Sequence, residues 1–266
     1  MKPDIIDIIK KLSIGTDNDV YYLTKPIDKD IETEKQYLKA RINENRIYSD
    51  SIVKTLPSFN KKYVHHEEWK IRKNSSTKLL SYLSGNKIQK TILELGCGNG
   101  WLSSKLSNIK NTVVIGMDIN HLELEQGARV FVKDNLLFVY ANIFDDNLNE
   151  LKFDHIILAS SLSYFDDLEK LLSRLYFILN NNGNIHLIDN PSCDSSELES
   201  AFQRSKYYYE RLLVPNMSKY YFHHNILEAI KKYDHEILYN PDSGFNKLRR
   251  KILKDNSPFY WIKLSK

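Results

Sequence analysis

The sequence predicts an α/β fold built on a doubly wound, mostly parallel sheet of seven strands. A short apolar run at 91–95 leads straight into a turn that contains three glycines. Between 91 and 189, five apolar segments alternate with segments of helical periodicity. Such alternation indicates parallel strands joined by right-handed helical crossovers. Two further apolar segments, at 236–239 and 259–264, complete the seven strands, and the last is expected to be antiparallel.

The glycine turn reads Glu-Leu-Gly-Cys-Gly-Asn-Gly, from Glu94 to Gly100. Glycine lets the backbone adopt positive φ angles and lets a ligand approach without meeting a Cβ atom. A helix is expected to begin at Trp101, and a strand, a glycine turn and a helix in this order are typical of a nucleotide-binding βαβ unit. Trp101 stands where a dinucleotide fingerprint needs its third glycine, which argues against a nicotinamide cofactor.

This turn closely resembles the first motif of class I S-adenosylmethionine-dependent methyltransferases, and the resemblance is motif-specific from Thr91 to Asp189. It implies a Rossmann-like methyltransferase fold with S-adenosyl-L-methionine as the cofactor. It also implies that the turn binds the cofactor through Glu94, Gly96, Cys97, Gly98, Asn99 and Gly100. The alternative for the turn is a purely structural one that binds no ligand.

The second predicted strand, 112–118, ends on an acid, Asp118. This position lies close to the offset of about 20 residues at which such folds carry a ribose-binding carboxylate. A carboxylate can accept hydrogen bonds from both ribose hydroxyls at once, and Asp118 is expected to do so. Ile119, next to it, is expected to lie against the adenine ring.

Further cofactor contacts are expected after the third and fourth strands, at Asn142, Ile143 and Ser160. The resemblance implies an acid at the position of Asn142, where it would hold the adenine amino group. This chain carries an amide there, whose oxygen can accept the same hydrogen bond without a charge. Because the carboxyl ends of parallel strands meet at one edge of a sheet, Ser160 is expected near Asp118.

Residues 1–85 are expected to form a helical lid over the site, with helices at 5–12, 30–49 and 66–83. The alternative is a helical layer that packs on the sheet without a role in the site. Arg72, on the third helix, could hold the methionine carboxylate of the cofactor, since a guanidinium binds a carboxylate bidentately. Its alternative partner is Glu68, one helical turn earlier.

The methyltransferase core is expected at 86–266, with an inserted cap at about 193–222 that is rich in aromatic residues. A protonated nucleophile needs a base before it can attack a methyl group, and histidine has a suitable pKa. His223 and His224 are the favoured candidates, because they lie in this aromatic stretch; the other candidates are His65, His66 and Tyr164. The alternative is that the aromatic residues only fill the core between cap and sheet.

Composition limits the partners and the compartment. The 38 basic and 34 acidic residues give a net charge of +4, which is weak support for nucleic-acid binding. Two cysteines, Cys97 and Cys193, cannot form a disulfide framework or a zinc site unaided, and no metal is expected. The amino-terminal segment 1–12 is interrupted by charges and no apolar run is long enough to span a membrane, so a cytoplasmic location is expected.

The leading functional hypothesis is methyl transfer to oxygen or nitrogen of a small, aromatic or apolar metabolite. One alternative is an RNA or protein methyltransferase, for which the basic stretch 246–254 would be the binding face. Against DNA amino-methylation, the fourth strand is followed by Ser160–Ser163, where that class carries Asp/Asn-Pro-Pro-aromatic. The second alternative is a non-catalytic cofactor-binding module.

Overall fold

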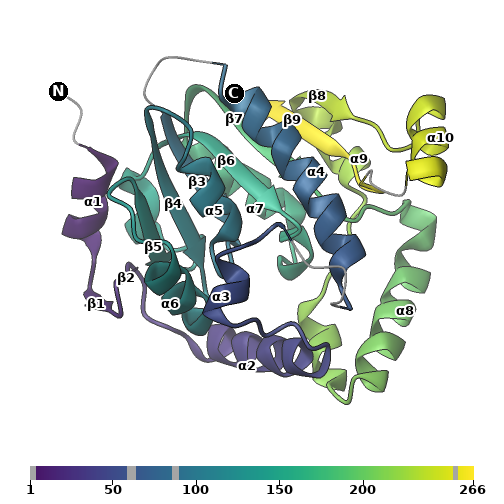
Figure 1. The fold of residues 1–266 in the computed structure, drawn as a ribbon, viewed down its shortest axis with the longest axis horizontal. Coiled ribbons are helices and arrows are strands. Elements are labelled where there is room, and N and C mark those ends of the chain that lie inside the picture. Colours follow the sequence, from purple (N-terminus) through teal and green to yellow (C-terminus); the bar gives the residue numbers. More distant parts are fainter. Residues whose placement is uncertain (1–3, 59–63, 86–89, 254–256) are drawn as a thin grey trace.

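The computed structural model describes residues 4–58, 64–85, 90–253 and 257–266, which form one sheet covered by helices on both faces (Figure 1). The described part of the sheet has nine strands. In order across it they are β1 (Gly15–Asp17), β2 (Val20–Tyr22), β5 (Leu136–Tyr140), β4 (Thr112–Asp118), β3 (Lys90–Leu95), β6 (Phe153–Ala159), β7 (Leu179–Ile188), β9 (Trp261–Ser265) and β8 (Asp234–Tyr239).

The predicted sheet of seven strands is therefore too small, because β1 and β2 add a hairpin beside β5. β2 runs parallel to β5, with Val20 opposite Phe138. β9 runs antiparallel to both of its neighbours, as expected for the last strand. The order β5-β4-β3-β6-β7 means that the chain moves outward from β3 in both directions. In such sheets the ligand crevice lies at the carboxyl ends of the central strands.

Two layers of helices cover the sheet. On one face the core includes side chains of α1 (Ile5–Leu12), α7 (Leu168–Ile178) and α9 (Ile226–Ala229). On the other face it includes side chains of α3 (Asp50–Val53), α4 (His66–Leu83), α5 (Trp101–Leu106) and α6 (His121–Val130). The buried residues of α7 are Leu168, Leu171, Leu172, Leu175 and Ile178, whose helical spacing places them on one face.

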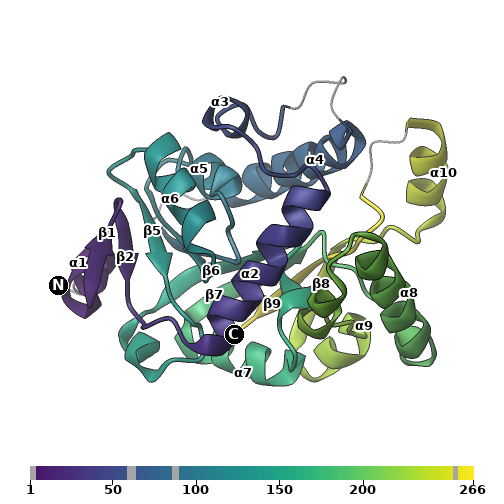
Figure 2. The ribbon, with the colours of Figure 1, turned by 90° about the horizontal axis from the view of Figure 1, so that it is seen from below.

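The helix α2 (Asp28–Asn43) lies across the carboxyl ends of the strands (Figure 2). It ends six residues before the predicted boundary at Ser49, because the chain turns at Asn45, whose φ is +57°. Its isoleucines at 31 and 42 are half exposed, whereas its buried residues include Asp30, Glu34 and Gln36. A helix with a polar buried face indicates a cavity beneath it rather than a packed core.

Several short segments follow β7, and two of them, α8 and η4, pack against α2. In chain order they are η3 (Ser195–Glu197), α8 (Leu198–Arg211), η4 (Pro215–Tyr220), α9, η5 (Ile230–Lys232) and, between β8 and β9, α10 (Gly244–Leu253). A small core of Ala40, Tyr209, Val214 and Met217 joins α2 to α8 and η4. β7 begins at Leu179, and residues 180–183 bulge out of its pairing with β6, where Asn182 has a φ of +65°.

Residues 1–85 contribute both strands and helices. β1 and β2 belong to the central sheet, and α1 packs beneath it, whereas α2 and α4 border the cavity. The boundary expected between 85 and 86 adjoins 86–89, which lie outside the described residues. Among the helices that the structure describes, none has the length and apolarity required to cross a membrane.

Candidate active site

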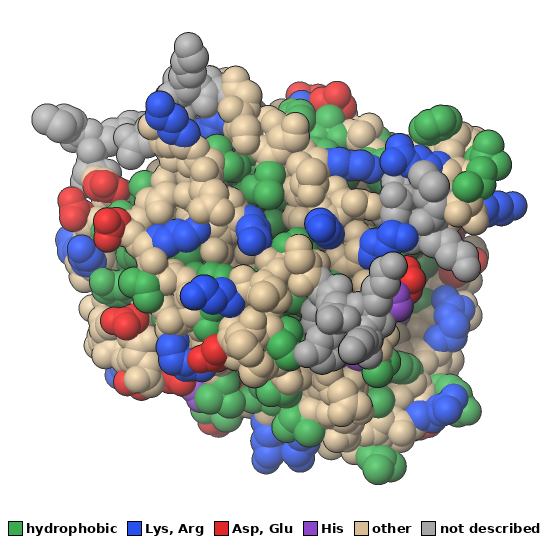
Figure 3. Space-filling model, in the orientation of Figure 1, with side chains coloured by type: hydrophobic (Ala, Val, Ile, Leu, Met, Phe, Trp, Pro, Cys, Tyr) green, Lys and Arg blue, Asp and Glu red, His purple; other side chains and the backbone are tan. Residues whose placement is uncertain are grey.

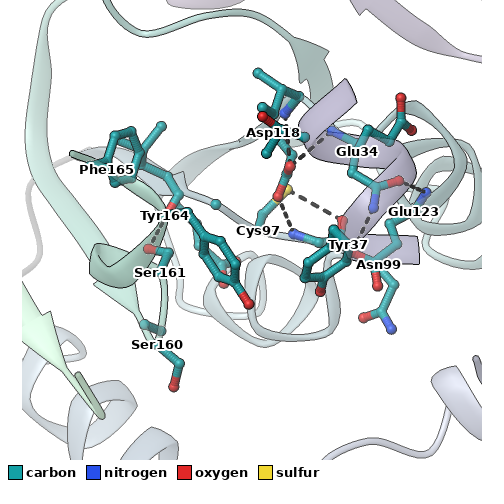
Figure 4. Close-up of a pocket in the computed structure, with 18 of the residues that line it drawn as sticks. Glu34, Tyr37, Cys97, Asn99, Asp118, Glu123, Ser160, Ser161, Tyr164 and Phe165 are labelled. Carbon is teal, nitrogen blue, oxygen red and sulfur yellow. Dashed lines mark hydrogen bonds between the residues drawn. The ribbon is translucent and has the colours of Figure 1, made fainter. Parts of the chain in front are cut away.

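A cavity of about 260 Å³ opens at the carboxyl ends of β3, β4, β5 and β6, beneath α2. Figure 4 shows Asp118, Glu34, Tyr37 and Glu123 on one side of it and Tyr164, Phe165 and Ser160 on the other. Most residues that the sequence singles out border this cavity. They are Arg72, Glu94, Gly96, Cys97, Gly98, Asn99, Asp118, Ile119, Asn142, Ile143, Ser160 and Tyr164.

The predicted histidines do not line the cavity in the described part of the chain. His223 Nε2 lies 2.8 Å from Ser205 Oγ on α8, and His224 Nε2 lies 2.9 Å from the carbonyl of Phe165. His65 Nε2 lies 2.7 Å from the carbonyl of Glu44. His66 Nε2 lies 3.0 Å from the carboxylate of its neighbour Glu67. These contacts tie the histidines to the surrounding helices and loops.

The glycine turn has the backbone that its sequence predicts. Gly96, Gly98 and Gly100 have φ values of +75°, +52° and +71°, which other residues adopt only at a cost. A Cβ atom at Gly96 would come within 2.5 Å of Ser161 Cβ, and one at Gly100 would overlap the ring of Phe138. Gly100 therefore packs against Phe138 and does not line the cavity. The backbone around Gly96 and Gly98 does border the cavity.

Asp118 is held at the end of β4 by backbone donors. Its Oδ2 accepts from the N–H of Gly98 at 2.8 Å, and its Oδ1 accepts from Ile119 and Asn120 at 2.7 and 2.9 Å. Burial nevertheless raises its pKa above the ordinary value, although these hydrogen bonds oppose the shift. The carboxylate is thus fixed in one orientation at the cavity wall, and Oδ2, which accepts one hydrogen bond, retains lone-pair capacity for a further donor.

Asn142 borders the cavity and its amide contacts two neighbouring groups. The amide oxygen accepts from the N–H of Phe144 at 3.1 Å, and the amide nitrogen lies 3.3 Å from both carboxylate oxygens of Asp30. Asp30 is on the first turn of α2, lines the cavity and is only 5% exposed. Burial raises its pKa. An acid from α2 therefore borders the cavity beside Asn142.

Two other carboxylates in the cavity wall are strongly perturbed. Burial raises the pKa of Glu94 to about 8, and its carboxylate accepts a short hydrogen bond from the Ser103 hydroxyl on α5. Burial also raises the pKa of Glu123 to about 7. Glu123 lies at the glycine turn, where a Cβ atom on Gly98 would be 3.0 Å from its Oε2. Clustered acids with raised pKa values are typical of functional sites.

Arg72 faces the cavity from α4 and also makes its alternative contact. Its Nε and NH2 atoms each lie 3.0 Å from Glu68 Oε1. Its guanidinium carbon lies 5.4 Å from the ring centroid of Trp69, which packs edge-on against Trp101 with centroids 5.4 Å apart. Arg72 is therefore positioned beside the glycine turn by an ion pair and by an aromatic wall.

Sequence reasoning missed the contribution of α2. Besides Asp30, this helix places Glu34, Tyr37 and Arg41 in the cavity wall. Glu34 Oε1 accepts from the N–H of His121 at 2.9 Å and also lies 2.6 Å from Nδ1 of that ring. The spacing of residues 30, 34, 37 and 41 at three and four is a helical stripe, so a search for polar as well as apolar periodicity could have found it.

The site fits an adenosyl cofactor in two respects beyond the motif. The glycine turn presents backbone at the cavity wall where Cβ atoms would intrude. Asn99 Oδ1, within the turn, is buried and has no hydrogen-bond partner among the described residues, so a ligand donor can satisfy it. In the same part of the chain, no group of three or more His, Cys, Asp or Glu side chains is placed to hold a metal ion.

Comparison with known proteins also points to a methyltransferase domain. The family model described as a methyltransferase domain matches residues 92–183. Malonyl-[acyl-carrier protein] O-methyltransferase 1 of Ilyobacter polytropus is 31% identical over 118 residues, which are 43% of this chain and 43% of that protein. The tRNA U34 carboxymethyltransferase of Campylobacter fetus is 28% identical over 104 residues, or 38% of this chain and 37% of that protein. These matches span less than half the length of either relative.

Solved structures agree in fold at low identity. The plantazolicin methyltransferase BpumL, in complex with a triazolic desmethylPZN analog and SAH, gives a TM-score of 0.55 at 17% identity. The alignment covers 90% of this chain and 98% of that one. The YcgJ protein from Bacillus subtilis gives 0.53 at 13% identity, covering 73% and 98%. Residues 92–183 thus match a methyltransferase domain, and the chain shares the fold of these solved structures.

Proposed function

We propose that this protein transfers a methyl group from S-adenosylmethionine to oxygen or nitrogen of a small, aromatic or apolar acceptor. The observation that carries the proposal is one continuous cavity with two unlike parts. One part is formed by the glycine turn and Asp118, and the other by the aromatic residues Tyr37, Tyr164 and Phe165. The first suits an adenosyl group and the second a molecule that presents apolar surface.

The chain's own residues bind and orient in this mechanism. Asp118 accepts the ribose hydroxyls, and the backbone around Gly96 and Gly98 borders the methionine end. Arg72 pairs with the methionine carboxylate, sharing its guanidinium with Glu68. When bound, the cofactor supplies a methyl group on a cationic sulfur, which is already reactive toward a nucleophile. The protein then gains rate by holding the two reactants in line and by excluding water.

The adenine end is assigned to Asp30. The amide oxygen of Asn142 already accepts a hydrogen bond from the N–H of Phe144. The neighbouring carboxylate of Asp30 is therefore the preferred acceptor for the adenine amino group. Both side chains come within reach because the first turn of α2 lies against the segment that follows β5. In this proposal the helix is part of the cofactor site as well as its cover.

A nucleic-acid substrate is less well supported. On the face seen in Figure 3, Lys and Arg side chains are dispersed among other residues and do not form a continuous track. The basic stretch of α10 also carries exposed Phe245, Leu248 and Ile252, which a phosphate-binding surface does not need.

Two measurements test the proposal. Calorimetry with S-adenosylmethionine and S-adenosylhomocysteine should give saturable binding that Asp118→Ala weakens. Tritium from labelled S-adenosylmethionine should then appear in small molecules of a cell metabolite extract. The absence of binding at millimolar cofactor would refute the cofactor assignment. Labelling confined to RNA or protein would refute the small-molecule acceptor.

A further inference from the structure

The helix α10 stands apart from the buried cores of the molecule. None of its described side chains belongs to the three apolar clusters that hold the rest of the chain together. Phe245, Leu248 and Ile252 are instead 72%, 58% and 68% exposed. Both ribbon views place α10 at one end of the molecule, away from the centre of the sheet (Figure 1 and Figure 2). One exposed apolar side chain is ordinary, but three on one short helix indicate an interaction surface.

These three side chains form one stripe along α10, here called the apolar stripe. They are spaced at three and four residues, which is the helical period. At about 100° per residue, Arg249 lies about 70° to one side of the centre of the stripe and Lys251 about 90° to the other. Lys247 and Arg250 lie farther round the helix, and Arg250 is half-buried. Cationic side chains therefore border the apolar stripe on both sides.

The apolar stripe lies in a local concentration of positive charge. The helix has four cationic side chains and no acidic one, whereas the whole chain has a net charge of only +4. Lys247 lies 3.5 Å from the carboxylate of Asp242, just before the helix. Within the described residues, no carboxylate lies at ion-pair distance from Arg249 or Lys251. Figure 3 shows Lys and Arg side chains beside hydrophobic ones at the end of the molecule where α10 lies. The two cations that border the stripe favour an anionic partner.

An anionic membrane surface matches both features of this face. Its phosphate groups lie directly above an apolar interior, so an amphipathic helix can insert its apolar side chains while Lys and Arg reach the phosphates. RNA offers phosphates without an apolar phase. A second copy of this chain would bring like charges together around the two stripes. The 10 residues of α10 extend about 15 Å, half the apolar thickness of a bilayer, so the helix would lie on the surface.

We propose that α10 binds the surface of a membrane that contains anionic lipids. Phe245, Leu248 and Ile252 insert among the acyl chains nearest the headgroups, and Arg249 and Lys251 contact the lipid phosphates. The helix then lies parallel to the membrane plane, and the sheet with its cavity remains in water. Binding is reversible, because only three large side chains leave the water. This inference does not depend on the methyl acceptor or on the proposed function.

Flotation with lipid vesicles tests the inference. One set of vesicles is pure phosphatidylcholine, and the other is an equal mixture of phosphatidylcholine and anionic phosphatidylglycerol. The intact protein should float with the mixed vesicles at low salt and much less with the neutral ones. Added salt should weaken the binding, because it screens the cations from the lipid phosphates. Failure to bind the mixed vesicles, or equal binding to both sets, would overturn the proposal.

Variants of α10 separate the apolar contribution from the charge. Leu248→Gln removes the middle side chain of the apolar stripe and should lower the partition coefficient at least about tenfold, the effect of transferring one large apolar side chain. Arg249→Gln with Lys251→Gln should lower it about thirtyfold, since each cation near an anionic surface contributes about fivefold. A thermal unfolding midpoint equal to that of the parent shows that the variants are folded. Parent-like binding by these folded variants would overturn the assignment to α10.

Matched substitutions elsewhere serve as controls. Val132→Gln changes an apolar side chain that is 82% exposed. Lys10→Gln with Lys11→Gln removes two exposed cations from α1, at the opposite end of the molecule (Figure 1). Both control proteins should bind the mixed vesicles as the parent does. If they lose as much binding as the α10 variants, the vesicles respond to overall charge or polarity, and the assignment to α10 is wrong.

A fluorescent probe on the apolar stripe reports insertion. Leu248→Cys is labelled with an environment-sensitive dye in a Cys193→Ser background, since the other cysteine, Cys97, is only 4% exposed. With mixed vesicles the dye emission should shift to shorter wavelength, because the dye leaves the water. Binding without this shift would overturn insertion. Dimers in light scattering that Leu248→Gln abolishes, without vesicle binding, would assign the stripe to a second copy of the chain instead.

Discussion

Replacement of Asp30 by asparagine tests whether the side chain of Asp30, on α2, accepts a hydrogen bond from the adenine amino group. The side chain is 5% exposed, and both of its oxygens lie 3.3 Å from Asn142 Nδ2. A hydrogen bond to a charged group contributes about 1.5–3 kcal/mol and one between neutral groups about 0.5–1.5 kcal/mol. The exchange therefore removes about 1–1.5 kcal/mol, and the dissociation constant for S-adenosylhomocysteine should rise about five- to twelvefold.

An analogue separates this contact from a general disturbance of the helix. S-inosylhomocysteine carries a carbonyl oxygen in place of the adenine amino group, so the Asp30 carboxylate should disfavour it. In Asp30→Asn the new amide can donate to that oxygen, and calorimetry should show the preference for the adenine ligand shrinking or reversing. The control is Asp28→Asn, which removes an exposed charge from the same helical turn. If Asp30→Asn weakens both ligands by the same factor, Asp30 does not contact the base.

Three further predictions follow from the same geometry. Asp118→Ala should weaken S-adenosylhomocysteine binding by about ten- to a hundredfold in calorimetry, and an unchanged affinity would refute its ribose role. Gly100→Ala should cost about 2–4 kcal/mol in urea denaturation through a positive φ and a collision with an aromatic ring. Gly244→Ala, with open space around it, is the control and should change little. Burial raises the Glu94 pKa from 4.5 to about 8, so the folded protein holds an extra proton between these values and loses stability as the pH rises through them. Glu94→Gln should flatten this decline in urea midpoints between about pH 5 and about pH 8; an unaltered slope would contradict the cause.

The sequence predicted the parts of the fold that are encoded locally. The strands β3 to β7 are mostly apolar and buried, α4 has the predicted bounds of His66–Leu83, and α5 begins at the predicted Trp101. β1 and β2 were missed because each has only three residues. The first helix has its predicted bounds of 5–12, but Gly15, soon after it, begins β1. Such short strands are fixed by pairing with distant residues, and β2 finds its parallel partner in β5.

In the candidate site, too, the sequence predicted the residues that lie close together in the chain and missed those that come from distant segments. The glycine turn and Asp118 could be predicted because the motif and the strand end lie within one βαβ unit. Asp30 could not, because its partner Asn142 is 112 positions away in the chain. Arg41 was missed for a second reason: α2 reads as a charged helix with an exposed face, although its polar stripe is the side that faces the cavity. Hydrophobic periodicity assigns no inward face to such a helix.

The pairing of β2 with β5 has a consequence for shortened versions of this chain. A fragment that begins at β3 would contain the whole glycine turn, but it would leave one side of β5 without a neighbour. All five residues of β5 are buried in the intact chain, and an uncovered strand of this kind templates association between molecules. Insolubility of a trimmed protein would therefore reflect the missing hairpin, and would say nothing against the nucleotide-binding half.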